Sequence, residues 1–169
     1  VTECAHQVWV SDITYIWTTE GWLYLAVILD LFSRAVVGWA TSARIDSELV
    51  CTAFQRATER HPLRFPLIMH SDRGSQYTSA MFRALLRCQS VLVFQSNGKS
   101  CYDNAIAESF FHTVKTEGVN HEQFARRDEG HGFLFDYIEV FYNQQRLHSS
   151  LGYNTPMQML QEIINTQAA

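Results

Sequence analysis

Hydrophobic residues change their spacing along the chain, and the change separates a strand-rich first part from a mixed second part. The first part holds three segments rich in Val, Ile, Trp and Tyr, at 7–17, 22–31 and 34–43. Residues of these types favour strands, and the almost continuously apolar segment 22–31 is typical of a central strand. Because the connections are short, the pattern predicts an antiparallel three-stranded meander.

From residue 46 onward, most apolar positions recur at the spacing of a helix. Helices are predicted at 46–60 with Asp46 as the cap, at 79–88, at 103–116 and at 133–147, and Pro156 opens a last short helix. Short apolar strands are predicted at 65–70 and 91–94. Gly130 and Gly132 lie just before the predicted start of the 133–147 helix.

Several large apolar side chains are expected to pack inside the molecule. The tryptophans lie in the strand segments and are expected to pack in the core or on the sheet: Trp9, Trp17, Trp22 and Trp39. Four residues of the 133–147 helix recur at spacings of three and four and are expected to face inward: Phe133, Tyr137, Val140 and Phe141.

The predicted order of elements is β-β-β-α-β-α-β-α-α. Strands come first and then alternate with helices, which predicts an α/β fold with a mixed five-stranded sheet, its first three strands antiparallel, and helices on both faces. No repeat or linker divides the 169 residues, so a single domain over 1–169 is expected. Because the chain does not begin with methionine, we expect it to be a fragment of something longer.

Composition excludes several classes of protein. With 47% hydrophobic residues the chain has enough apolar material for a core, which excludes disorder. No apolar run reaches the roughly 18 residues of a membrane span, and the start of the chain has no signal-peptide pattern. The cysteines show no metal-binding spacing and are expected to be free thiols in the cytoplasm: Cys4, Cys51, Cys88 and Cys101.

Three acidic residues lie in settings that are unusual for a carboxylate. Asp12 lies inside the first strand segment, where an acid is costly unless it is paired or binds a cation. Asp72 follows an apolar strand, and the carboxyl ends of strands are where open α/β sheets place their sites. Glu108 lies within the 103–116 helix among Ala and Phe residues. Any one of these acids alone is more simply explained by solvation or an arginine partner.

Together, the three acids favour a site for Mg²⁺ or Mn²⁺, since hard cations prefer oxygen ligands. Two such ions roughly 4 Å apart activate an attacking oxygen and stabilise a leaving oxygen at phosphorus. Asn104, Glu108 and Lys115 share a helix face, and Lys115 lies roughly 10 Å along the axis from Glu108. Lys115 is therefore either a phosphate contact or an ordinary surface lysine. The net charge of −4 counts mildly against strong DNA binding by this chain alone.

At these residues the sequence resembles the catalytic core of the DDE transposases of bacterial insertion sequences, relatives of the retroviral integrases. The resemblance covers nearly the whole chain, and 35 residues separate Asp72 from Glu108, the spacing known in this family. Five motifs carry it, in order: WVSDITY at 9–15, LDLFSR at 29–34, HSDRGSQY at 70–77, DNAIAESFF at 103–111 and YNQQRLHSSLGYNTP at 142–156.

The resemblance implies a ribonuclease H-like fold and two Mg²⁺ ions (or Mn²⁺) bound by Asp12, Asp72 and Glu108. It implies cleavage of DNA at the element's ends, followed by attack of the freed 3′-hydroxyl on another phosphodiester. Residues expected to contact DNA are Lys115, Lys99, Asn104, Arg73 and Arg146. The expected partners are the element ends and target DNA, in a homodimer or larger assembly without a membrane, in the bacterial cytoplasm at the nucleoid.

Two features depart from the family's pattern. The loop at 96–101 has less arginine than the family leads us to expect, and Gly130 and Gly132 interrupt a stretch that usually favours a helix. The family's upstream helical DNA-binding region is expected to lie outside this chain, and with it the recognition of the element's ends.

Other residues have competing interpretations. Asp30 is either a helper acid or, more simply, a structural partner of Arg34. Arg146 and His148 either contact DNA or hold the C-terminal segment on the core. Tyr77 is expected to pack rather than act as a nucleophile, and adjacent strand residues such as His70 and Ser71 point to opposite faces and cannot form a hydrolase triad.

Two other functions compete with the transposase interpretation. A ribonuclease H-like nuclease would cut DNA without joining it, and a decayed insertion-sequence protein would keep the fold without activity. The motif at 142–156 favours the transposase over the nuclease, and the intact acidic residues argue against the decayed protein.

Overall fold

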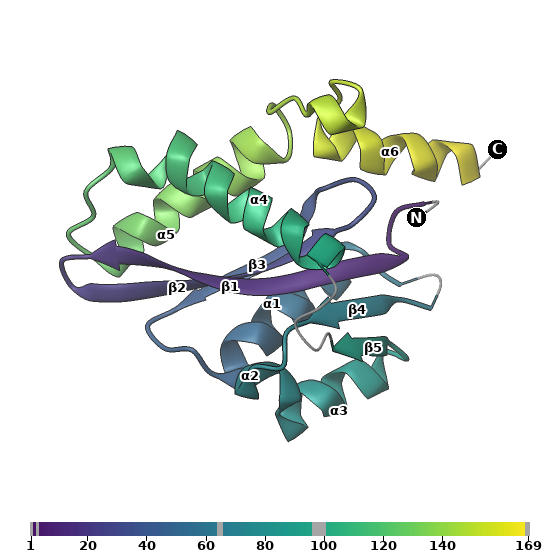
Figure 1. Cartoon of the computed structure of the whole chain (residues 1–169), viewed down its shortest axis with the longest axis horizontal. Coiled ribbons are helices and arrows are strands. Elements are labelled where there is room, and N and C mark those ends of the chain that lie inside the picture. The colour runs from purple at the N-terminus through teal and green to yellow at the C-terminus, as the bar shows by residue number, and fades with distance from the viewer. Residues whose placement is uncertain (1, 3, 64–65, 96–100, 168–169) are drawn as a thin grey trace.

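The computed structural model describes residues 2, 4–63, 66–95 and 101–167, with only the backbone described at 95, 101–104 and 162–167. A five-stranded sheet in the order β3-β2-β1-β4-β5 forms its centre (Figure 1). The strands are β1 (Val8–Thr18), β2 (Gly21–Asp30), β3 (Val36–Ser42), β4 (Ile68–Ser71) and β5 (Leu92–Gln95). The predicted mixed sheet with three antiparallel first strands is confirmed.

The two sides of β1 are paired over very different lengths. On one side, β1 pairs with β2 from Trp9↔Asp30 to Thr18↔Gly21. On the other side, it pairs with β4 in parallel, and only over Val8–Val10. The part of β1 beyond Val10 therefore has β2 as its strand neighbour and leaves its other edge open.

The helices follow the predicted order, with additional short turns. They are α1 (Ser47–Arg60), α2 (Ser75–Thr78), α3 (Ala80–Cys88), α4 (Cys101–Glu117), α5 (Arg127–Phe135) and α6 (Pro156–Gln167). A π-helix, η2 (Asp136–Tyr142), continues α5, and 3₁₀ turns form η1 (Val119–His121) and η3 (Ser149–Leu151). Asp46 caps α1 as predicted, because its Oδ1 accepts a hydrogen bond of 3.0 Å from the Leu49 N–H.

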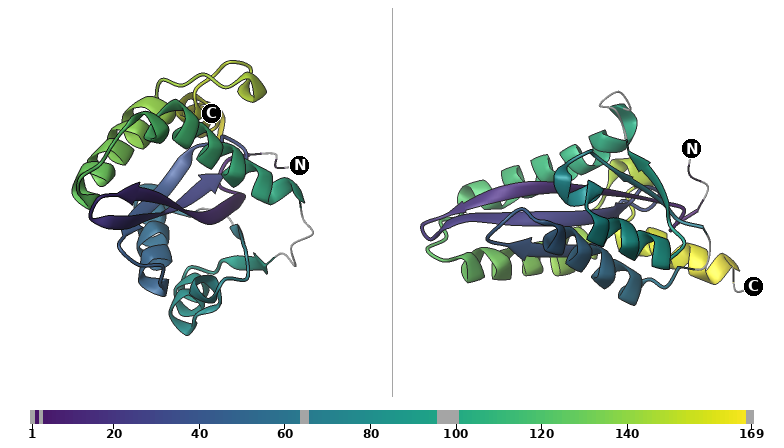
Figure 2. Two further views of the ribbon diagram at one scale, coloured as in Figure 1. Left: turned by 60° about the vertical axis from the view of Figure 1, so that its left-hand side comes forward. Right: turned by 90° about the horizontal axis from the view of Figure 1, so that it is seen from below.

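Helices cover both faces of the sheet, as predicted (Figure 2). On one face, Ala53 and Phe54 of α1 and Phe82 of α3 pack with Trp9 and Ile28 of the strands. On the opposite face, α4 and α5 pack on the other side of β1 and β2. In the described part of the chain, no helix is both long and apolar enough to cross a membrane.

The prediction of one helix over 133–147 is wrong in three respects. The helix begins at Arg127, so Gly130 and Gly132 lie inside it. It turns into the π-helix at Asp136, which ends at Tyr142. Because a π-turn changes the angular spacing of side chains, Val140 and Phe141 are 45% and 39% exposed rather than inward.

The four tryptophans divide into two pairs. Trp9 and Trp39 are buried at 0% and 3% exposure, as predicted. Trp17 and Trp22, by contrast, are 59% and 42% exposed, so they lie outside the core and pack edge-to-face on each other on the sheet. Both lie where β1 and β2 extend beyond β4, and this position removes the neighbours that would cover them.

Candidate active site

The register of the sheet brings Asp12 and Asp72 to neighbouring positions. In the parallel pairing of β1 with β4, Val10 lies opposite His70. Asp12 and Asp72 each come two residues later, and positions two apart along a strand face the same side. Neighbouring strands lie roughly 5 Å apart, so the two carboxylates occupy adjacent positions, Asp12 within β1 and Asp72 directly after the end of β4.

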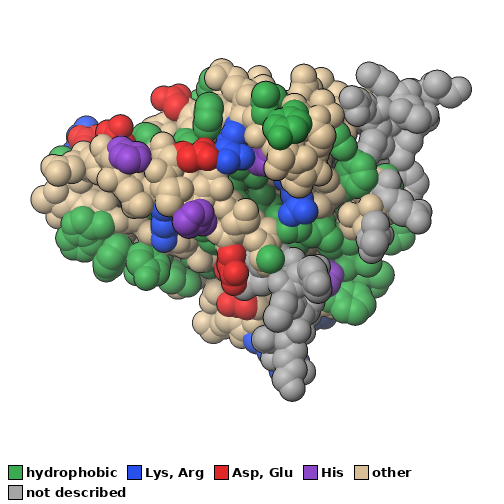
Figure 3. All heavy atoms as spheres, turned by 45° about the horizontal axis from the view of Figure 1, so that its top comes forward, with side chains coloured by type: hydrophobic (Ala, Val, Ile, Leu, Met, Phe, Trp, Pro, Cys, Tyr) green, Lys and Arg blue, Asp and Glu red, His purple; other side chains and the backbone are tan. Residues whose placement is uncertain are grey.

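The third acid reaches the same place from α4. Val10 of β1 packs in one cluster with Ile106, Ala107 and Phe110 of α4, so this part of the helix lies against β1. Glu108 comes directly after the fully buried Ala107 and is itself exposed. Figure 3 shows acidic side chains gathered near the lower centre of this face of the molecule.

The electrostatics of Asp12 indicate that Asp72 and Glu108 lie near it. Burial raises the pKa of Asp12, and the negative charges of Asp72 and Glu108 raise it further. A hydrogen bond of 2.8 Å from the Ile13 N–H to Asp12 Oδ1 acts in the opposite direction. A carboxylate beside two others gains from a cation, because the cation neutralises the mutual repulsion.

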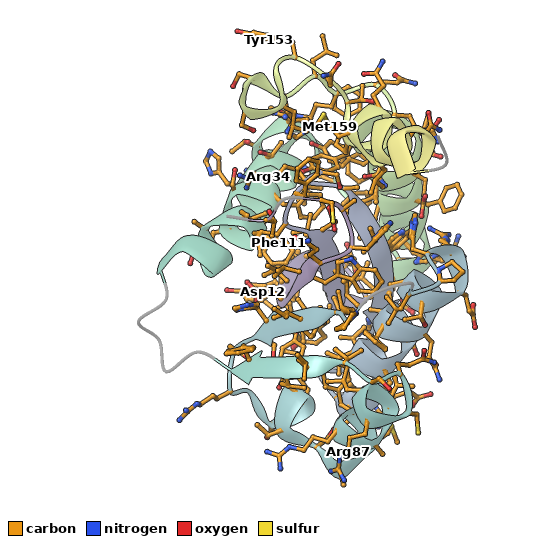
Figure 4. The ribbon with its side chains drawn as sticks, turned by 90° about the vertical axis from the view of Figure 1, so that its right-hand side faces the viewer. Asp12, Arg34, Arg87, Phe111, Tyr153 and Met159 are labelled. Carbon is orange, nitrogen blue, oxygen red and sulfur yellow. The ribbon has the colours of Figure 1, made fainter. Side chains whose placement is uncertain are left out.

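The donor set fits a divalent metal ion that is shared with a substrate. Among the described residues, no group of three His, Cys, Asp or Glu side chains is close enough to enclose an ion by itself. Mg²⁺ is usually bound through one or two carboxylates together with substrate phosphates and water, not in an all-protein cage. Asp12, labelled in Figure 4, is half-buried beside the charges of Asp72 and Glu108, and this arrangement matches that mode of binding.

Tyr77 packs against β1 next to Asp12. Its ring is buried at 1% exposure and packs edge-to-face on Phe82, with centroids 5.6 Å apart. Its hydroxyl lies 2.9 Å from Ser11 Oγ, one residue before Asp12. Burial raises the pKa of the Tyr77 hydroxyl, which therefore stays protonated. The expectation that Tyr77 packs rather than reacts agrees with this position.

Asp30 does not pair with Arg34, so that interpretation is wrong. Asp30 is completely buried, and its Oδ1 accepts hydrogen bonds of 2.8 Å from both the N–H and the hydroxyl of Ser33. Its Oδ2 accepts a bond of 2.7 Å from the His6 N–H. The link to Arg34 is through the backbone, from the Arg34 N–H to the Asp30 carbonyl. Asp30 thus fixes the β2–β3 turn and the N-terminal segment.

Arg146 is held by an acid rather than presented to solvent. Its Nε and second terminal nitrogen donate to both carboxylate oxygens of Glu117, at 2.6–3.2 Å. This bond from Arg146 lowers the pKa of Glu117. Burial, followed by the charges of Arg146 and Arg34, lowers the pKa of His148 to about 4, so its ring is neutral at pH 7. The structural interpretation of Arg146 and His148 therefore accounts for their contacts.

Of the other residues expected to contact DNA, the structure describes the side chains of Lys115 and Arg73. Lys115 lies at the far end of α4, with its Nζ 5.1 Å from the centre of the Tyr15 ring. Arg73 is exposed directly after Asp72. Lys99 and the side chain of Asn104 lie outside the described residues.

Two models of known families match this chain. Residues 2–98 match the integrase core domain family, and residues 108–162 match a second model with the same description. The chain belongs to the integrase core domain family. The resemblance to DDE transposase cores that the motifs indicated is thereby confirmed.

Curated relatives of this integrase core domain are transposases. The chain is 46% identical over 153 residues to transposase InsF for insertion sequence IS3fB of Escherichia coli K12, covering 90% of this chain and 53% of that protein. It is 44% identical over 151 residues to the transposase for insertion sequence element IS904 of Lactococcus lactis, covering 89% and 60%. The chain therefore spans a little over half the length of these relatives.

Solved structures with the same fold are retroviral. The HTLV-2 integrase catalytic core domain in complex with magnesium superposes with a TM-score of 0.69 at 18% identity, covering 94% of this chain and 98% of that one. The simian T-cell lymphotropic virus intasome in complex with a PP2A regulatory subunit gives a TM-score of 0.75 at 16% identity, covering 94% and 55%. At this level of identity, these structures establish the ribonuclease H-like fold alone.

This integrase core domain also has a basic cavity that the sequence did not indicate. A cavity of about 360 Å³ lies between α4 and the C-terminal segment, and its polar lining includes Arg34, Ser109, Thr113 and Ser149. Arg34 reaches it from a tight turn, where its backbone has a φ of 63°. Ser109 follows Glu108 on α4, so the cavity adjoins the acidic region. A tight turn between two strands gives no sequence signal for such a role.

Proposed function

We propose that this chain is the catalytic core of a DNA transposase that uses divalent metal ions, Mg²⁺ or Mn²⁺, to transfer phosphoryl groups. The observation that carries the proposal is the convergence of Asp12, Asp72 and Glu108 from β1, the end of β4 and α4. The 44–46% identity to insertion-sequence transposases supports the same class of reaction.

The reaction has two displacements at phosphorus. Water first cleaves a phosphodiester at the end of the element, and the freed 3′-hydroxyl then attacks a phosphodiester of the target. Two bound ions would supply charge for the attacking and leaving oxygens. The three carboxylates hold those ions, and their separate elements leave the outer side open for DNA.

Basic residues around the carboxylates would position the DNA backbone. Lys115 lies on the same helix as Glu108, about two turns further on. Arg73, beside Asp72, and Lys99 and Asn104, before Glu108, are proposed phosphate contacts by their place in the sequence. Arg146 would act indirectly, by fixing Glu117 and the end of α4.

The proposal extends to the assembly. Joining two DNA ends requires two active sites, so we propose a dimer or larger assembly on DNA in the bacterial cytoplasm, at the nucleoid. The chain would act as one catalytic core domain over 1–169, with recognition of the element's ends by a region outside it.

Branched DNA that mimics a joined product tests the proposal. The chain is incubated with this DNA and Mn²⁺ or Mg²⁺, beside Asp72→Asn and a control, Asp128→Asn, whose exposed carboxylate lies 3.2 Å from Arg126 at the surface. We expect metal-dependent breakage and rejoining by the chain and the control, and loss in Asp72→Asn. Cutting without joining would indicate a nuclease instead. If no DNA is cut or joined, even when the upstream region of a relative is fused to the chain, the protein is a decayed one.

A further inference from the structure

Three aromatic side chains lie exposed in a row on the β1–β2 hairpin. Tyr15, Trp17 and Trp22 are 53%, 59% and 42% exposed. Trp22 lies between the other two, with ring centroids 5.0 Å from Tyr15 and 4.8 Å from Trp17, both edge-to-face. Two neighbouring exposed tryptophans are costly to leave in water, so a surface of this kind marks a binding site.

The row forms one wall of a cavity. The cavity has a volume of about 530 Å³, and its other wall is the segment that follows α4, with Asn120 and Gln123. Lys115 lies on the rim, with its Nζ 5.1 Å from the centre of the Tyr15 ring. Figure 3 shows hydrophobic side chains in a row along the lower left edge, with a basic side chain directly above them.

The charge of the cavity is small and unevenly placed. Among its described lining residues, Lys115 supplies the positive charge and Glu122 the negative charge. The ammonium of Lys115 lies over the Tyr15 ring, and this cation–π contact helps to hold it at the rim. The amides of Asn120 and Gln123 can both donate and accept hydrogen bonds.

Two elements join the cavity to the carboxylates. Along β1, Tyr15 comes three residues after Asp12, a distance of roughly 10 Å. The two side chains leave opposite faces of the strand, and Lys115 of α4 reaches the Tyr15 ring at the open edge of β1. Along α4, Lys115 comes seven residues after Glu108, again roughly 10 Å. Successive nucleotides of one strand rise by about 3.4 Å, so a strand that starts at the carboxylates reaches the cavity within about three nucleotides.

The chemistry of the walls selects an unpaired nucleotide. Aromatic faces bind bases by stacking without regard to sequence, and an ammonium binds phosphate. The faces of paired bases are covered by their neighbours in a duplex, so a base must leave the stack to reach an aromatic wall. A protein segment would also bury the tryptophans, but it would not explain a lysine on the rim from the helix that carries Glu108.

We propose that this cavity receives an unpaired nucleotide of the DNA strand that leads away from the reacting phosphate. Its base stacks on Trp17 and Trp22, and its phosphate binds Lys115. The site would hold the end of the strand in line after the duplex has opened near the cleavage point. This inference rests on the proposed function, since it assigns a substrate position to the same active site.

Tryptophan fluorescence tests the proposal without metal or catalysis. Trp9 and Trp39 are buried, so quenching by added DNA reports on the exposed pair. The chain is titrated with a 12-nucleotide single strand and with an abasic strand of equal length. We expect quenching and about 5- to 100-fold tighter binding with the base-bearing strand, the range for base–aromatic stacking.

Matched variants show which side chains cause the preference for base-bearing DNA. Trp17→Leu should remove the preference for bases, and Trp17→Phe should restore part of it. Phe135→Leu, at a side chain 47% exposed outside the cavity, should keep the full preference. Lys115→Ala should weaken both strands by a similar factor, because it removes a phosphate contact. Circular dichroism shows whether each variant is folded, and Trp17→Phe keeps the test valid if Trp17→Leu unfolds.

Three results would overturn the inference. One is equal binding of base-bearing and abasic strands; a second is an unchanged preference in Trp17→Leu. The third is self-association of the chain in the absence of DNA, if Trp17→Leu abolishes that self-association. This result would assign the aromatic wall to a protein interface. If branched DNA is joined while bases are not preferred, the inference fails and the proposed function stands. If bases are preferred but no DNA is cut or joined, the proposed function fails, and the cavity binds unpaired nucleotides without serving a reacting phosphate.

Discussion

Gly38 of β3 packs where no side chain has room, and replacing it tests how α1 lies on the sheet. A Cβ atom at Gly38 would lie 2.5 Å from the Ala53 carbonyl oxygen and 2.6 Å from Ala57 Cβ. It would also lie 2.8 Å from the Ala57 backbone nitrogen. Two of these three atoms belong to the backbone of α1, so Gly38→Ala requires the whole helix to move.

The expected cost follows from that geometry. Overpacking a core usually costs about 1–3 kcal/mol. Because the clash is with helix backbone and not with the end of a flexible side chain, we expect the upper end, about 3 kcal/mol. Domains of this size unfold with about 5–15 kcal/mol, so the loss is a large share, and Tm should fall by about 6–12 °C.

Gly132 is the matched control. It lies inside α5, and a Cβ there would meet no atom within 4 Å. Alanine favours a helix over glycine by about 0.5–1 kcal/mol, so Gly132→Ala should be more stable than the parent chain.

Urea unfolding followed by circular dichroism measures both variants. The midpoints should move in opposite directions, with little change in the dependence on urea. If Gly38→Ala lost less than about 0.5 kcal/mol, or if both glycine variants shifted in the same direction, the close approach of α1 to β3 would be wrong.

Three further predictions follow from the charged groups. The pKa of Asp12 is raised in the folded protein, so the free energy of unfolding falls as pH rises through the raised pKa. In the presence of chelator, Asp12→Asn should therefore raise Tm more at pH 8 than at pH 4. An equal rise in Tm at both pH values would contradict the raised pKa. Asp30→Ala should lower the free energy of unfolding in urea by about 3 kcal/mol, because it leaves buried donors without an acceptor. Asp30→Asn should lower it by less. Equal losses in the two variants would count against the hydrogen-bond network of Asp30. The pKa of Glu117 is lowered by Arg146, so their pairing stabilises the fold above the ordinary pKa of 4.5 and is lost as pH falls through the lowered pKa. Because Glu117 is 39% exposed, Glu117→Gln should cost less than about 1 kcal/mol at pH 7 by thermal melting, and this cost should shrink as the pH is lowered; a cost that does not fall with pH would refute the pairing.

Local patterns in the sequence predicted most of the fold. The strands at 7–17 and 22–31 and the helix at 46–60 ended within two residues of their observed bounds, because alternation, apolar runs and the Asp46 cap are local signals. The helix at 133–147 was misplaced because the close packing of Gly130 on Leu23, where a Cβ would lie 2.9 Å from Leu23 Cδ2, is a tertiary contact.

The sequence indicated the acidic residues of the candidate site, but it did not indicate the contacts and exposure of the residues around them. Asp12 and Asp72 stood out because each lies in or directly after an apolar strand. The exposure of Trp17 and Trp22 depends on how far β4 extends along β1, which no local pattern contains. The partner of Arg146 was equally hidden, since Glu117 lies 29 residues away in the sequence.

The number of Mn²⁺ ions bound to the chain with branched DNA tests the carboxylate site most directly. Electron paramagnetic resonance counts free Mn²⁺ at increasing total concentration, with the parent chain, Asp12→Asn and the surface control Asp128→Asn. We expect two ions per active site in the parent and the control, as two-metal phosphoryl transfer requires, and fewer in Asp12→Asn. The same number of ions in Asp12→Asn as in the parent would contradict the assignment of Asp12 to the metal site.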